Sequence, residues 1–253
     1  RIFPWNHANC GDLNLSGERR PQSYLRETLW SDAPVSYIVV TPPVPSFPLN
    51  PDKADWSVWD FPDVVDHWNF PGYEWKKMTV SVYSNCEQVE LFLNGESLGK
   101  QENTADKKNT LVWEVPYAHG ILKAVSYNKG GEVGTATLES AGKVEKIRLS
   151  ADRTEIVADG NDLSYITLEL VDSKGIRNQL AEELVEFSIE GDATIEGVGN
   201  ANPMSIESFV ANSRKTWRGS NLLVVRSGKS SGRIIVTAKV KALPVASITI
   251  TQK

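Results

Sequence analysis

The stretch Val80-Ser81-Val82-Tyr83-Ser84-Asn85, continued by Val89-Glu90-Leu91-Phe92-Leu93-Asn94-Gly95-Glu96-Ser97-Leu98-Gly99, decides the fold class of this chain. Apolar and polar residues alternate in these segments, and that alternation is the period of a half-buried strand. Asn94-Gly95 is the dipeptide that most strongly predicts a two-residue hairpin, because both central residues of such a turn adopt a positive φ. The stretch therefore predicts short antiparallel strands joined by tight turns.

The same pattern extends to the C-terminus of the sequence. Strands are expected at 111–115, 120–127 and 133–138, and their spacing of about 8–12 residues predicts an immunoglobulin-like sandwich. Ala141-Gly142-Lys143 is predicted to be a hinge into a second sandwich. Strands of that sandwich are expected at 146–150, 156–157, 165–171, 185–189, 193–198, 209–211, 222–226, 232–239 and 247–251.

Two segments of different texture precede the strands. Pro21 to Trp30 predicts a short helix, with Pro in the first turn and Tyr24, Leu25, Thr28 and Leu29 at helical spacing. One short helix cannot bury its apolar face alone, so it packs either on the next domain or on a part of the protein outside this sequence. Residues 31–72 are rich in Pro and Trp, which predicts one strand at Tyr37–Val40 and otherwise an extended loop held by large aromatic rings.

The predicted fold class is all-β, with two immunoglobulin-like β-sandwich domains in tandem behind a short helical segment. The expected boundaries are 1–32 for the helical segment, 33–141 for the first sandwich with its Pro/Trp-rich leading loop, and 142–253 for the second sandwich.

Composition and charge exclude several classes of function. A net charge of −5 over 253 residues, with scattered Lys and Arg, lacks the basic footprint of a nucleic-acid binder. No apolar run is long enough to predict a membrane-spanning helix. Cys10 and Cys86 lie far apart, and with His7, His67 and His119 they show no metal-ligand spacing. The chain opens at Arg1 without Met or a signal peptide, which predicts an internal fragment of a longer protein.

Three blocks of residues carry a family resemblance. The stretch from Gly11-Asp12-Leu13 through Pro21-Gln22-Ser23-Tyr24-Leu25-Arg26-Glu27-Thr28-Leu29-Trp30 resembles the end of the catalytic TIM barrel in family 2 glycoside hydrolases of the β-galactosidase type. Val80–Asn85 with Val89–Gly99 resembles the sandwich that follows the barrel. Leu149–Asp152, Ala158–Leu163 and Gly197–Pro203 resemble the C-terminal immunoglobulin-like domain of these enzymes.

The resemblance implies a bacterial parent enzyme of carbohydrate metabolism that hydrolyses O-glycosyl bonds of β-galactosides with retention of configuration. Retention needs two carboxylates about 5–5.5 Å apart, and in the family both lie in the barrel upstream of the matching motif. We therefore expect no catalytic residue, no metal and no cofactor in this chain, and not an enzyme but accessory domains that brace the barrel. The expected partner is the chain's own catalytic barrel, with no nucleic acid and no membrane. The family places such proteins in the periplasm, at the cell surface or outside the cell.

An aromatic set supports a different class of function. Exposed rings can stack on the apolar face of a pyranose, so a carbohydrate-binding module is the alternative prediction. The opposing interpretation is that the rings pack in a core or dock the barrel, and Trp5, Tyr24 and Trp30 fit docking. A third possibility is an adhesin-like structural spacer without a ligand. The candidate sugar-binding residues are Trp56, Trp59, Trp68, Tyr73 and Trp75.

Clustered carboxylates are more simply explained as turns than as sites. Asp60 with Asp63, Glu182 with Glu183, and Asp159 with Asp162 lie close in sequence, but Asp-Gly and Asn-Asp are turn-forming pairs. A calcium ion at Asp159, Asn161 and Asp162 is the alternative, although the spacing does not match the twelve-residue calcium loop. The sequence leaves open whether either sandwich binds calcium or sugar.

Overall fold

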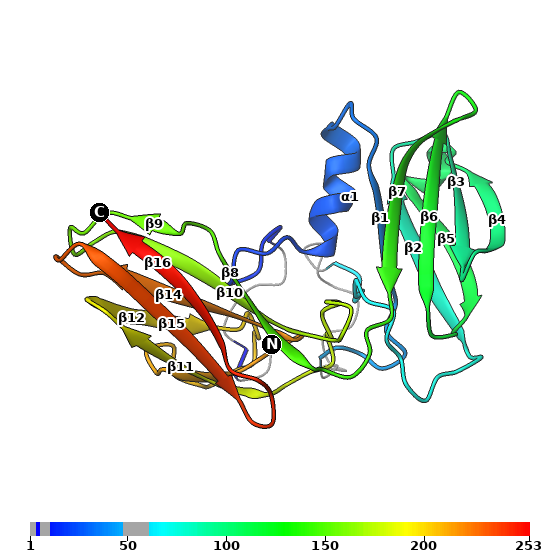
Figure 1. Cartoon of the computed structure of the whole chain (residues 1–253). Helices are drawn as coiled ribbons and strands as arrows, with labels where there is room; N and C mark the ends of the chain where they lie inside the picture. Colours follow the sequence, from blue (N-terminus) through cyan, green and yellow to red (C-terminus); the bar gives the residue numbers. More distant parts are fainter. Residues whose placement is uncertain (1–3, 6–10, 48–60) are drawn as a thin grey trace. The chain divides into compact units, whose positions relative to one another are not determined.

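The computed structural model describes residues 4–5, 11–47 and 61–253 (Figure 1). The described chain divides into two compact units, with residues 11–47 and 61–140 in unit 1 and residues 4–5 and 141–253 in unit 2. Both units are built from two sheets packed face to face, and the strand pairs are antiparallel except for the short parallel pair of residues 155–156 with residues 251–252. The prediction of an all-β fold with tandem sandwiches is confirmed. No helix among the described residues is long and apolar enough to cross a membrane.

The described part of unit 1 contains one α-helix and seven strands in two sheets. The three-stranded sheet has the order β1-β2-β5, and the four-stranded sheet has the order β4-β3-β6-β7. A single 3₁₀ turn, η2 (Ala105–Lys107), precedes β5. The other elements are α1 (Pro21–Trp30), β1 (Ser36–Val40), β2 (Lys77–Ser84), β3 (Gln88–Leu93), β4 (Glu96–Glu102), β5 (Thr110–Pro116), β6 (Ile121–Asn128) and β7 (Gly131–Glu139).

Two hairpins of unit 1 follow directly from their turn residues. Asn94 (φ 52°) and Gly95 (φ 87°) join β3 to β4, and Lys129 (φ 50°) and Gly130 (φ 78°) join β6 to β7. Positive φ at both central positions matches the right-handed twist of the flanking strands. The hairpin predicted at Asn94-Gly95 is therefore confirmed.

The core of unit 1 lies between its two sheets, where alternate residues of each strand point inward. Val80 and Val82 of β2 face Leu91 of β3 and Leu122 of β6, and all four are fully buried. Burial of a Val or Leu side chain stabilises a fold by about 1.5–3 kcal/mol relative to exposure. The alternation read from the sequence is thus the alternation between core and surface.

Nine strands in two sheets make up the described residues of unit 2. One sheet has the order β12-β14-β10-β8, and the other has the order β13-β11-β15-β16-β9. Phe187, Leu223 and Ile234 are among the side chains that fill the space between the sheets. The strands are β8 (Lys146–Ala151), β9 (Glu155–Ile156), β10 (Leu163–Val171), β11 (Leu184–Glu190), β12 (Ala193–Gly199), β13 (Ser213–Lys215), β14 (Ser220–Ser227), β15 (Gly232–Val240) and β16 (Ala246–Gln252).

One predicted strand of unit 2 is wrong. Residues 209–211 form a turn, and the strand of this region is β13 at Ser213–Lys215. The apolar run Phe209-Val210-Ala211 predicts a strand by composition. The backbone N–H and C=O groups of β11, however, pair with Ser213, Arg214 and Lys215. The apolar residues of the run remain on the surface loop between β12 and β13.

Candidate functional site

The five candidate sugar-binding aromatic residues fall into three groups. Trp56 and Trp59 lie outside the described residues. Trp68 has no exposed surface, and its ring packs edge to face against Phe70 (5.9 Å between centroids) and Tyr117 (5.0 Å). The indole N–H of Trp68 donates a 2.8 Å hydrogen bond to the carbonyl oxygen of Ala118. A ring with no free face cannot stack on a sugar, so Trp68 acts as the aromatic centre of the unit 1 core.

Trp75 has the opposite environment. Its side chain is 79% exposed, and its backbone has a φ of 67°, which is the left-handed region. The backbone holds this conformation because the N–H of Trp75 donates a 2.8 Å hydrogen bond to the carbonyl oxygen of Tyr117. A bulky residue in this region costs about 1–2 kcal/mol, so the surrounding turn over-determines the geometry.

Tyr73 lies between these two extremes. Its ring is partly buried against the unit 1 core, and the ammonium group of Lys76 lies 4.7 Å from the ring centroid. The N–H of Tyr73 donates to the carbonyl oxygen of Phe70, and its own carbonyl oxygen accepts from the N–H of Lys76. Within the described part of the predicted set, Trp75 alone presents most of its ring to solvent.

Helix α1 is the second surface with exposed aromatic character. Tyr24 stacks on Tyr37 of β1 at 3.6 Å between centroids, and the guanidinium of Arg19 covers the other face of Tyr24 at 3.9 Å. Leu29 and Trp30, at the C-terminal end of the helix, are 64% and 85% exposed. Tyr24 therefore holds the helix to its own sandwich, whereas Leu29 and Trp30 remain available to another surface.

Polar contacts also fasten α1 to the sandwich. The side-chain amide of Asn109 donates to Thr28, to Oγ1 at 3.0 Å and to the carbonyl oxygen at 3.3 Å. The side-chain amide of Asn85 donates to the carbonyl oxygens of Ser31 (3.0 Å) and Ala33 (2.9 Å), and its Oδ1 accepts from the N–H of Val35 (2.8 Å). These bonds satisfy backbone groups at and beyond the helix C-terminus, which would otherwise remain without intrahelical partners.

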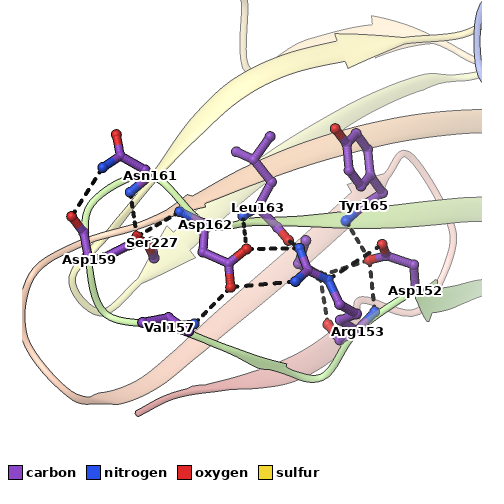
Figure 2. A network of polar contacts seen from close by, with 10 residues as sticks. Asp152, Arg153, Val157, Asp159, Asn161, Asp162, Leu163, Tyr165 and Ser227 are labelled. Atoms are coloured by element: carbon purple, nitrogen blue, oxygen red, sulfur yellow. Dashed lines mark hydrogen bonds and ion pairs between the residues drawn. The ribbon is translucent and has the colours of Figure 1, made fainter.

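The acidic loop of unit 2 is a turn network (Figure 2). Asp159 Oδ1 accepts the N–H groups of Asn161 and Asp162, each at 2.8 Å. The two carboxylate oxygens of Asp162 accept the N–H of Val157 (2.9 Å), the N–H of Leu163 (2.9 Å) and the guanidinium of Arg153 (3.0 Å). Backbone hydrogen bonds hold the pKa of Asp159 and that of Asp162 below their usual value, with Arg153 adding to the effect at Asp162. Each carboxylate is thus engaged in holding the turn.

The other carboxylate pairs give no catalytic geometry in the described chain. Asp60 lies outside the described residues, and Asp63 Oδ2 accepts the N–H of Ser46 at 2.7 Å. No group of three or more His, Cys, Asp or Glu in the described residues could hold a metal ion. The carboxylate of Asp63 thus has a local structural role.

A surface groove of about 700 Å³ lies in unit 2. Its wall includes Leu180, Ala181 and Leu243, with Lys143 and Lys241 among the charged residues. Asn178 also lines the groove. Its side-chain amide donates to the carbonyl oxygen of Gly142, and its Oδ1 accepts from the N–H of Leu180. A specific ligand site needs a few convergent polar groups that are free to bind, and Asn178 is already committed to the fold.

Arg214 was not predicted from the sequence, and it is the largest charged side chain that unit 2 buries completely. It lies on β13 and reaches beneath the loop of residues 200–212. No signal in the sequence separates this Arg from the exposed Lys and Arg residues, because burial of its guanidinium depends on how the loop folds over it.

Comparisons with known proteins place the chain in a family. A crystal structure of a glycosyl hydrolase family 2 member from Bacteroides cellulosilyticus matches all of the chain with 99% identity and a TM-score of 0.98, over 32% of that protein. The family model for glycoside hydrolase family 2 C-terminal domain 5 matches residues 147–249. The chain belongs to glycoside hydrolase family 2 and corresponds to the C-terminal region of its members. The family resemblance predicted from the sequence is thereby confirmed.

Relatives in glycoside hydrolase family 2 carry two different activity names. The β-galactosidase BoGH2A of Bacteroides ovatus is 31% identical over 95% of this chain and 25% of its own length. A β-glucuronidase of Formosa agariphila is 30% identical over 78% of this chain and 20% of its own length. A domain of unknown function, DUF4982, matches residues 76–134 in unit 1. The chain spans about a quarter of the length of the curated relatives that it matches.

Proposed function

We propose that this chain is a non-catalytic accessory region that braces the catalytic domain of a β-galactosidase-type glycoside hydrolase. The observation that carries the proposal is the two-sided character of α1. Its residues Tyr24 and Thr28 are fastened to the unit 1 sandwich, whereas Leu29 and Trp30 are exposed at its C-terminal end. A helix that is fastened on one side and carries two exposed apolar side chains at its end is suited to connect a sandwich to a second domain.

The relatives support the rest of the proposal. They are glycoside hydrolases, and the chain corresponds to 32% of the structure that it matches at 99% identity. Catalytic carboxylates that retain configuration would then lie in the remaining part of the whole protein. A β-galactoside is the proposed substrate, and a β-glucuronide is the competing one, since both names occur among the relatives. A periplasmic or surface location remains a prediction from the family resemblance.

The first experiment measures turnover. The purified 253-residue chain and the whole protein are compared at equal molarity on chromogenic β-galactoside and β-glucuronide. We expect turnover of the galactoside by the whole protein only. Turnover by the 253-residue chain, above that of a mock purification, would overturn the accessory role. If the whole protein turned over the glucuronide alone, the proposed β-galactoside substrate would be wrong.

The second experiment tests bracing in the whole protein. The double variant L29A/W30A is compared with R26A, which removes an exposed side chain of the same helix together with its surface ion pair to Asp12. An exposed ion pair contributes only about 0–1 kcal/mol. Alanine has the highest helix propensity, so a loss of stability does not come from a weaker intrinsic preference for the helix. A docked Trp is a typical interface hot spot worth about 2 kcal/mol or more. We expect faster thermal inactivation of L29A/W30A only, and equal inactivation of both variants would refute bracing by this surface.

A second candidate function is favoured by the exposure of Trp75. A pinned indole with most of its ring in solvent can stack on the apolar face of a pyranose. Titration of the whole protein with galactose, lactose and plant polysaccharides, followed by tryptophan fluorescence, tests this. Quenching that W75A abolishes would support a carbohydrate-binding module. Unchanged fluorescence would leave the bracing role or a ligand-free spacer.

A further inference from the structure

The loop of residues 200–212 joins β12 to β13 and carries an apolar outer surface. Ile206 is 78% exposed, Phe209 is 47% exposed and Val210 is 81% exposed. Isolated exposed apolar residues are normal on a protein surface, but three within five positions of one loop form a patch. We call Ile206, Phe209 and Val210 the apolar loop patch.

A buried cation fixes this loop from beneath. The guanidinium of Arg214 is fully buried and donates to the carbonyl oxygens of Val198 and Glu207, each at 3.2 Å, and to Ser205 Oγ at 3.1 Å. The same guanidinium lies 4.2 Å from the ring centroid of Phe209. A charge is costly to bury unless hydrogen bonds or an opposite charge compensate it, and here three hydrogen bonds do so.

The negative charge nearest to Arg214 is linked to it through a hydroxyl group. Ser205 Oγ donates to Glu207 Oε2 at 3.0 Å while it accepts from Arg214, and Glu207 Oε1 accepts the N–H of Lys215 at 3.0 Å. The guanidinium therefore ties two separate points of the loop, Ser205 and Glu207, to strand β13. This arrangement holds the backbone beneath the apolar loop patch in one conformation.

The loop also closes an edge of the four-stranded sheet. The N–H of Val198 on β12 donates to the carbonyl oxygen of Phe209 at 2.8 Å, and the carbonyl oxygen of Val198 accepts from Arg214. Hydrogen bonds between near neighbours hold the start of the loop, where the N–H of Asn202 donates to Asn200 Oδ1 at 3.1 Å and that of Met204 donates to Asn202 Oδ1 at 2.9 Å. The exposed side chains are thus carried on backbone that is hydrogen-bonded at both ends.

We propose that the apolar loop patch is a preformed docking surface for the catalytic part of the same polypeptide. This inference rests on the proposed function, in which the chain is attached to a catalytic domain. A preorganised surface loses little conformational entropy on docking, which is the advantage that the buried Arg214 provides. The proposal extends the bracing role from α1 in unit 1 to a second, separate surface in unit 2.

The size of the patch favours a tethered partner over a second copy of the chain. Three side chains bury on the order of 400 Å² at most, since even an aromatic side chain buries only about 150–250 Å². A stable interface between free subunits buries about 800 Å² per partner. A covalently attached partner has an effective concentration of about millimolar, so a much smaller surface is sufficient. The match covers 32% of the structural relative that is 99% identical, so about two thirds of that relative lie outside the matched part.

The test uses cysteine accessibility in the whole protein. V210C is compared with V245C, a matched control in which an exposed Val of the same unit is replaced in the same way. Labelling of the protein without either variant gives the background from the natural cysteines. We expect the thiol of V210C to react with a maleimide at least about tenfold more slowly than that of V245C. Equal labelling rates would show that the loop is uncovered and would overturn the proposal.

A photocrosslink identifies what covers the loop. A benzoylphenylalanine residue replaces Val210, and the irradiated whole protein is denatured, sized and mapped by mass spectrometry. A product of one chain's mass, linked to a peptide outside residues 1–253, supports the proposal. A product of doubled mass, or a link within residues 1–253, overturns it. Because L29A/W30A tests α1 independently, failure here would leave the proposed bracing by unit 1 standing.

Discussion

Trp68 and Trp75 are seven positions apart, and the structure predicts opposite consequences when each is replaced by alanine. Trp68 is fully buried, packs against Phe70 and Tyr117, and donates a 2.8 Å hydrogen bond to Ala118. Truncation of a buried Trp costs about 3–5 kcal/mol, and an orphaned carbonyl adds to that cost. W68A should therefore destabilise unit 1 by about 4 kcal/mol. Because Trp75 is 79% exposed, W75A should change the free energy of unfolding by less than about 0.5 kcal/mol.

Equilibrium unfolding in urea, followed by far-ultraviolet circular dichroism, measures both effects on the 253-residue chain. For an m-value of about 2 kcal/mol/M, W68A should lower the midpoint of the unit 1 transition by about 2 M. W75G adds an internal check, because glycine relieves the strain of the left-handed backbone at φ 67°. The free energy of unfolding of W75G should therefore exceed that of W75A by up to about 1 kcal/mol. A loss below about 1 kcal/mol for W68A, or a loss for W75A equal to that of W68A, would refute this account of the aromatic set.

Three further predictions concern titrating groups and metal ions. Burial raises the pKa of Tyr83 to about 12, so the folded state keeps the hydroxyl proton at a pH where the unfolded state releases it. The contribution of neutral Tyr83 to the free energy of unfolding is therefore fully present up to about pH 10. That contribution should disappear between pH 10 and 12 in a pH series of urea midpoints, and Y83F should flatten the decline; an equal decline in Y83F would contradict the assignment. Burial acts to raise the pKa of Asp172, but N–H donors from Gly142, Ile176 and Lys174 outweigh it and hold the pKa below its usual 3.8. The stability that this carboxylate provides is present above about pH 4 and is lost as the pH falls further, so D172N should destabilise unit 2 at pH 7 by about 1–3 kcal/mol and show a weaker loss in acid. Since the carboxylates of Asp159 and Asp162 are engaged by N–H donors and Arg153, neither millimolar calcium nor a chelator should shift the Tm; a calcium-dependent rise of several degrees would contradict the turn interpretation.

Local patterns predicted most of the strands because the determinants of a hairpin are short-range. Alternation over Val89–Leu93 and the Asn94-Gly95 pair specify a strand and its turn without reference to the rest of the chain. The failure at residues 209–211 has the opposite cause. Its apolar composition is that of a strand, but the backbone partner on β11 is taken by Ser213–Lys215, and pairing between distant segments cannot be read from composition.

The all-β class, the helix at Pro21–Trp30 and the family resemblance could be predicted from periodicity and from motifs of contiguous residues. Which aromatic residues are exposed depends on the packing of the folded chain. Trp68 and Trp75 are seven positions apart, yet one indole is at the centre of a core and the other is in solvent. The burial of the Arg214 guanidinium could likewise not be predicted from the sequence. Burial depends on which distant segments fold over a side chain, and residue type and spacing do not carry that information.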